Sequence, residues 1–197
     1  MAPVEHRAIA DRNVEAILGA AEGLLLQGKP LNFSAVAAAA HVSRPTVYSH
    51  FADRGQLLSA LVERSVRLAT DAMQAAEPGR GRAADALARV VSVAWEHLAR
   101  HIAIARTVMA ELPRDVAHEH HLRVEALLEE LIERGQARGE FRRDLSASWL
   151  ATSCLGIIHA AASRVASGDL ESGGAVDALE RTVVDLCIGT HPRRKST

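Results

Sequence analysis

Apolar residues recur along the whole chain at helical spacing. Between residues 9 and 27 they fall three and four positions apart, on one face of a helix, and no stretch of the chain alternates with the period of two typical of a strand. The members of this stripe are Val14, Ile17, Leu18, Ala21, Leu24 and Leu25. Gly28 and Pro30 end it. The pattern predicts an all-α protein that opens with a long helix.

Breaker residues divide the rest of the chain into further helices. A long helix is predicted to begin at Asp53, whose carboxylate can cap it, and to reach about Ala76 before Pro78 and two glycines. Beyond it, the helical patterns cover residues 82–112, 115–138, 146–166 and 174–188. The basic tail, residues 191–197, is predicted to be disordered.

Residues 32–58 predict two short helices joined by a turn, His41-Val42-Ser43. Asn32 and Ser43 can cap them, because each side chain can accept a hydrogen bond from an unpaired amide of the first turn. Pro45 falls in the first turn of the second helix, where its missing amide proton costs nothing. The residues expected to hold the pair to a core are Val36, Ala37, Ala40, Val47 and Phe51. The residues left facing outward are Arg44, Thr46, Tyr48, Ser49 and His50. Such a helix pair can place its second helix in a DNA groove.

This segment resembles the DNA-binding motif of the TetR family of transcriptional regulators. The matching positions are Val36-Ala37, Val42-Ser43, Thr46, Tyr48, His50-Phe51 and Leu57-Leu58. His41 stands where the family usually has glycine, so the turn is expected to hold a non-glycine residue at positive φ, which histidine tolerates better than most residues. Arg54 replaces the usual lysine and keeps the positive charge that such proteins direct at a phosphate. The alternative is a generic helical hairpin in which Tyr48 and His50 only pack.

The resemblance implies a ligand-responsive transcriptional regulator, a repressor by the habit of the family, that binds a palindromic DNA operator as a homodimer. It implies a three-helix DNA-binding domain over residues 1–54 and a helical effector-binding and dimerisation domain over 55–190, followed by the tail. It also divides residues 82–112 into helices 82–100 and 101–112, since no breaker residue marks the point between Arg100 and His101. The expected DNA-binding residues are Ser43, Arg44, Pro45, Thr46, Tyr48, Ser49, His50 and Arg54. Among them, Arg44 and Thr46 suit base edges, and Tyr48, His50 and Arg54 suit phosphates.

Two apolar stripes near the C-terminus predict a dimer interface, which the resemblance describes as a four-helix bundle. The first stripe is Ala151, Leu155, Ile158 and Ala162, and the second is Val176, Leu179, Val183 and Leu186, spaced like a coiled-coil seam. Gly156, Ala160 and Ala161 allow close approach of helices. The alternative is that both stripes face the subunit's own core.

A small, largely apolar effector is expected within residues 82–165. Trp95, Met109, Trp149 and His159 could line its cavity, although tryptophan in a helix is more often plain core. His97 and His101, four apart, could instead bind a metal in a metal-responsive regulator, but no third ligand is evident. A second cluster, His118, Glu119, His120 and His121, fits a solvated surface equally well. No metal or cofactor is therefore predicted.

Composition narrows the remaining function classes. The chain has 197 residues, 48% of them hydrophobic, and a net charge of −1, so DNA binding would depend on where charges lie. Cys154 and Cys187 fall in apolar stretches and are expected to be buried free thiols of a cytoplasmic protein. No apolar run reaches membrane-spanning length, and no signal peptide is evident. A helical enzyme is the alternative of another class, but no catalytic Ser/His/Asp arrangement, phosphate-binding glycine loop or paired carboxylates appear, so the protein is predicted not to be an enzyme.

Overall fold

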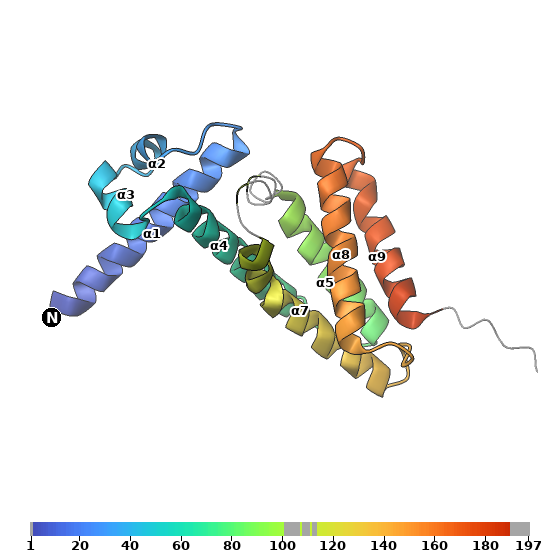
Figure 1. Cartoon of the computed structure of the whole chain (residues 1–197). Helices are drawn as coiled ribbons and strands as arrows, with labels where there is room; N and C mark the ends of the chain where they lie inside the picture. Colours follow the sequence, from blue (N-terminus) through green and yellow to red (C-terminus); the bar gives the residue numbers. More distant parts are fainter. Residues whose placement is uncertain (1, 101–106, 108–110, 112–113, 190–197) are drawn as a thin grey trace, which may run out of the picture. The chain divides into compact units, whose positions relative to one another are not determined.

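The computed structural model describes residues 2–100, 107, 111 and 114–189. Within these residues every regular element is a helix, which confirms the all-α prediction (Figure 1). The elements are α1 (Ala2–Leu26), α2 (Phe33–Ala39), α3 (Arg44–His50), α4 (Arg54–Ala75), α5 (Ala83–Arg100), α7 (Arg114–Ala137), α8 (Ala147–Ala166) and α9 (Ser172–Ile188).

The predicted helix bounds agree with these elements to within two residues, with two exceptions. The first helix begins at Ala2 rather than near residue 9. The predicted helix 101–112 lies almost wholly outside the described residues, although Thr107 and Glu111 are helical. The tail, 191–197, also lies outside them.

The chain folds into two compact units. The head unit comprises residues 1–65 and 103–120, and the body unit comprises residues 66–102 and 121–197. The head unit includes the predicted DNA-binding stretch, residues 1–54. Both α4 and α7 begin in the head unit and end in the body unit.

In the head unit, α1 packs against α2, and α2 against α3. The predicted stripe of α1 supplies much of the core, and Ile17 and Ala21 are completely buried. The other core residues are Leu18, Leu24, Leu25, Leu31, Phe33, Val36, Ala37, Val47, Phe51, Leu57, Leu58, Leu61 and Val62. Arg64 of α4 bonds Glu22 of α1 at 3.0 Å and lies 3.3 Å from Glu15, so an ion pair ties the two long helices at the edge of this core.

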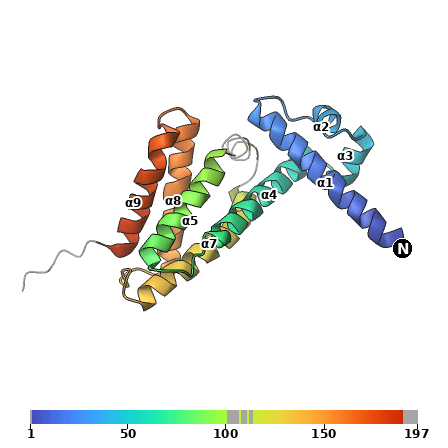
Figure 2. The ribbon, with the colours of Figure 1, turned by 180° about the vertical axis from the view of Figure 1, so that it is seen from behind.

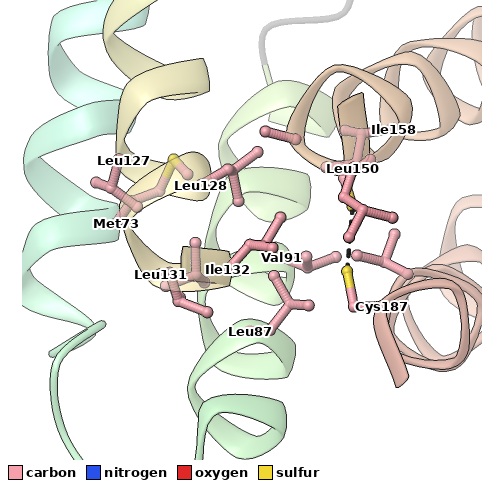
Figure 3. Packing of buried hydrophobic residues seen from close by; sticks show 14 of the residues in the cluster. Met73, Leu87, Val91, Leu127, Leu128, Leu131, Ile132, Leu150, Ile158 and Cys187 are labelled. Atoms are coloured by element: carbon pink, nitrogen blue, oxygen red, sulfur yellow. Dashed lines mark hydrogen bonds between the residues drawn. The ribbon is translucent and has the colours of Figure 1, made fainter. Parts of the chain in front are cut away.

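In the body unit, α5, α8 and α9 lie side by side (Figure 2). Figure 3 shows their core, in which Leu87 and Val91 of α5 meet Leu150 of α8 and Cys187 of α9. The body portions of α4 and α7 add Met73, Leu127, Leu128, Leu131 and Ile132 to the same cluster. Gly135 of α7 is required by close packing, because a Cβ atom there would overlap the ring of Phe141.

Candidate DNA-binding surface and effector domain

Hydrogen bonds between residues three positions apart stabilise the first turns of α2 and α3. Asn32 caps α2 by accepting from the amide of Ala35 at 2.9 Å, and Ser43 caps α3 by accepting from the amide of Thr46 at 3.2 Å. Pro45 lies in the first turn of α3, where no amide donor is needed. Each of these predicted features is confirmed, so the local geometry of α3 follows from residues within and next to the helix.

The turn between the two helices contains a left-handed residue. His41 has a φ of 55°, as its place at the usual glycine position predicts. The amide of Val42 donates to the carbonyl of Ala37 at 3.0 Å, which satisfies an orphan carbonyl at the end of α2. Histidine is one of the few non-glycine residues enriched at such φ values, so the turn keeps its shape without glycine.

The outward face of α3 presents the predicted contact residues. Arg44, Pro45, Tyr48 and Ser49 are exposed, and Thr46 and His50 are half-buried. The hydroxyls of Ser43 and Thr46 share a 2.7 Å hydrogen bond. The ring of Tyr48 meets Phe33 edge to face at a centroid distance of 4.8 Å, which fixes the ring while leaving the residue 51% exposed. The face therefore offers one exposed guanidinium and one anchored phenol.

Arg54, the expected phosphate contact, is already engaged. Its Nε and Nη2 atoms donate to the two carboxylate oxygens of Glu111 at 2.6 and 2.7 Å, and its Nη1 donates to the carbonyl of Leu31. The hydrogen bond to Glu111 raises the pKa of Arg54 and lowers the pKa of Glu111. No motif in the sequence points to Glu111, which is 57 positions away from Arg54.

The C-terminal stripes are largely absorbed by the subunit itself. Ala151 and Val183 are completely buried, and Ile158 and Leu179 are 3% and 4% exposed, within the core of one subunit. These four side chains are therefore core residues and have no area left for a partner, in agreement with the alternative that the stripes face inward. Leu155, Val176 and Leu186 are half-buried, and they are the predicted interface residues with surface to offer.

The candidate effector residues that the structure describes differ in their exposure to solvent. Trp95 is 3% exposed and part of the body core, whereas Trp149 is 62% exposed on the outside of α8. His159 is half-buried and has an interaction partner, and Met109 lies outside the described residues. Trp149 is thus not the wall of an internal cavity, because most of its ring faces solvent.

Of the predicted histidine pair, His101 lies outside the described residues. His97 is half-buried in α5 and has an interaction partner. The side chains of His118, Glu119, His120 and His121 are likewise outside the described set. Among the residues that are described, no group of three or more His, Cys, Asp or Glu side chains could hold a metal ion.

The two cysteines meet inside the body unit. The Sγ atoms of Cys154 on α8 and Cys187 on α9 are 3.9 Å apart, and both thiols are free and completely buried (Figure 3). The hydrogen bond to Cys187 and burial together raise the pKa of the Cys154 thiol. The prediction of buried free thiols is confirmed.

A capped helix-turn-helix is the arrangement that many DNA-binding regulators use to place a helix in the major groove. Residues 17–61 match the family model of bacterial regulatory proteins of the tetR family, and residues 84–186 match that of the Tetracyclin repressor-like C-terminal domain. The chain therefore belongs to the TetR family of transcriptional regulators. No curated protein matches it.

Several solved structures share the fold. A Rhodococcus protein assigned to the TetR family is 22% identical, with a TM-score of 0.75 over 91% of this chain and 100% of its own. FadR from Bacillus subtilis, in complex with stearoyl-CoA, is 21% identical, with a TM-score of 0.73 over 90% and 99%. LfrR from Mycobacterium smegmatis, in complex with proflavine, is 24% identical, with a TM-score of 0.64 over 91% and 98%.

Within the described ranges, no helix combines the length and the apolar character needed to cross a bilayer.

Proposed function

We propose that this regulator is a repressor that binds a palindromic operator as a homodimer and is released by a small, largely apolar effector. The observation that supports it most is the outward face of α3, where an exposed arginine starts a short helix whose inner side is fixed by buried Val47. A rigid helix of this kind can enter the major groove with its N-terminal residues at the base edges. Since it would act on DNA in the cell, the cytoplasm is its expected location.

The side chains of α3 divide into two roles in this proposal. Arg44 and Thr46, at the N-terminal end, contact base edges, and a guanidinium pairs well with the O6/N7 edge of guanine. Tyr48 and His50 contact phosphates and set the register, with Ser43, Pro45 and Ser49 close to the backbone. Thr46 would exchange its hydrogen bond with Ser43 for one to DNA.

We place the dimer contact on the outward faces of α8 and α9. Positions 149, 153, 156, 160 and 163 fall on one face of α8, and four of them, all but the half-buried Ser153, are exposed. Trp149 is a large exposed apolar side chain at one end of this face, and Gly156 has open space where a Cβ would be. Small residues beside a large one let two copies of the helix approach closely. Leu155, Val176 and Leu186 can add to the contact.

We infer that the effector binds within residues 82–165, most of which belong to the body unit. The apolar composition of this unit favours a ligand with a large apolar part, as in the complexes of FadR with stearoyl-CoA and of LfrR with proflavine. Met109, His159 and the inner residue Trp95 remain the candidate contacts. A tenfold release of DNA requires the ligand to favour one conformation by about 1.4 kcal/mol.

A DNA-binding assay with one variant tests the central claim. The protein should shift a DNA fragment from its own promoter region, and Arg44→Ala should cost about 1–3 kcal/mol on that fragment and relax the preference at one base pair per half-site. On scrambled DNA the same variant should lose much less affinity. Equal losses on both DNAs would contradict base reading by Arg44, and no shift by the wild type would contradict the function.

Addition of the ligand tests the remaining part of the proposal. Lipophilic candidates, including a long-chain acyl-CoA, are titrated while tryptophan emission and release of the promoter fragment are followed in the same samples. Zinc and nickel are titrated separately. Release by metal alone that disappears in His97→Ala would overturn the apolar effector in favour of a metal.

A further inference from the structure

The donor edge of the Arg54 guanidinium that is formed by Nε and Nη2 is already occupied. The guanidinium has five N–H donors, of which three are used, two by the Glu111 carboxylate and one by the carbonyl of Leu31. The contact with Glu111 is bidentate, with both oxygens of the carboxylate lying along the edge formed by Nε and Nη2. The positive charge expected for a phosphate is therefore balanced by a carboxylate within the same unit.

We propose that Glu111 and a DNA phosphate compete for Arg54, so that Glu111 lowers and tunes the affinity of the head unit for DNA. The inference rests on the proposed DNA-binding function. A carboxylate and a phosphate both fit the planar donor edge of arginine through two parallel hydrogen bonds, and that edge accepts one of them at a time. DNA binding through Arg54 then requires Glu111 to leave.

This chain has arginine at position 54, where the family usually has lysine, and the difference affects the competition between Glu111 and a phosphate. A lysine, usual in the family at this position, offers a compact point charge that moves readily between partners. Arginine offers a fixed pair of donors that holds a carboxylate in one geometry. Arg54 and Glu111 therefore act together, and the departure from the family pattern changes how strongly the phosphate contact is restrained.

Arg54 and Glu111 belong to the same unit, although 57 positions separate them along the chain. The guanidinium and the carboxylate are 41% and 38% exposed, and solvent-exposed ion pairs are weak. The pair can therefore change DNA affinity by at most about fivefold.

Glu111→Gln tests the competition, because it removes the charge and keeps the shape. On both the promoter fragment and a scrambled duplex of equal length, the affinity should rise by up to about fivefold. The slope of log K against log salt should steepen by roughly one phosphate contact. Glu130→Gln is the matched control, an equal change of charge on an exposed residue of α7 in the body unit, and its slope should equal that of the wild type.

A double variant, Arg54→Ala with Glu111→Gln, tests whether Glu111 affects DNA binding through Arg54. In an Arg54→Ala background, Glu111→Gln should have no further effect on affinity or slope. If Glu111→Gln alone weakens binding as Arg54→Ala does, Glu111 holds Arg54 in place for DNA and the competition is overturned. An unchanged affinity and slope in Glu111→Gln also overturns it.

Two further results separate the inference from the function. If Glu111→Gln does not fold by circular dichroism, Arg54→Lys takes its place, since lysine cannot form the bidentate pair and should raise the salt slope. A wild type that shifts neither DNA overturns the function together with the inference. A wild type that binds, with variants that bind identically, overturns the inference alone.

Discussion

The helix pairs α2–α3 and α8–α9 come from similarly apolar stretches, yet their residues behave differently. In α2–α3, the predicted capping side chains have local partners, Asn32 at the amide of Ala35 and Ser43 at the amide of Thr46. In α8–α9, only part of each predicted stripe is buried, and its buried members, such as Ile158 and Val183, face their own subunit. Local hydrogen bonds specify a position, whereas an apolar stripe specifies burial without specifying the partner.

The strongest test of that difference is a buried charge on α9. Val183→Glu should prevent the body unit from folding, with a loss of more than about 4 kcal/mol, because the carboxylate has no partner in the core. Thr182→Glu, on the exposed neighbouring position, should change stability by less than about 0.5 kcal/mol. Urea unfolding followed by circular dichroism measures both. If Val183→Glu instead folds and is a monomer, Val183 lies at the contact between subunits and not in the core.

A second test uses the outward face of α8. Gly156→Arg should leave the subunit folded but weaken self-association roughly a hundredfold, about 3 kcal/mol, because a long charged side chain fills the proposed contact. Gly156→Ala is the control, since a Cβ there meets nothing within 4 Å and alanine is the better helix former. Sedimentation of both variants over a range of concentrations gives the association constants. A full dimer for Gly156→Arg would place the contact on another surface.

Matched cap deletions compare the two helix pairs at equal chemistry. Ser43 caps α3 and Ser146 caps α8, each through its hydroxyl to an amide three residues on. Ser43→Ala and Ser146→Ala should each cost about 1 kcal/mol in unfolding free energy. Only Ser43→Ala should also weaken promoter binding, because only α3 is proposed to contact DNA. Similar losses of DNA affinity in both would show that the binding surface extends to the body unit.

The smallest effect concerns acid pH. The partner Arg54 holds the pKa of Glu111 below its ordinary value near 4.5, so the pair stabilises the fold above that value. The contribution is lost as the pH falls through the lowered pKa. The wild type and Glu111→Gln should therefore differ slightly in Tm near pH 6 and converge in more acidic buffer. A difference that grows on acidification would contradict the sign of the shift.

Much of the head unit could be predicted because its signals are local. Caps, a proline in the first turn and an apolar stripe act over three or four residues, so a single sequence contains them. The positive φ of His41 is the clearest case, since the motif fixed the conformation even though the residue was unusual. The sequence pattern did not predict that α1 begins at Ala2. No capping or helix-breaking residue near residue 9 shows where the helix begins.

The contacts that could not be predicted join distant residues. The Arg54–Glu111 pair spans 57 positions, and no pattern in the intervening sequence identifies which of many acids will be chosen. Trp149 shows the same limit for burial, because an aromatic residue on an apolar helix can face either way. The exposed ring of Trp149 and the buried ring of Trp95 follow from how α8 and α5 pack, which depends on all the helices at once.

The reactivity of the two buried cysteines measures how often the body unit opens. The chain has only two cysteines, Cys154 and Cys187, and both lie in the body unit with no exposed surface. A thiol reagent can reach them only when that unit opens, so the labelling rate follows its local unfolding and is blind to fraying of the head. The native protein therefore contains its own chemical probe of this local unfolding. Its rate, with and without DNA, gives the free-energy cost of opening the body unit without any engineered probe.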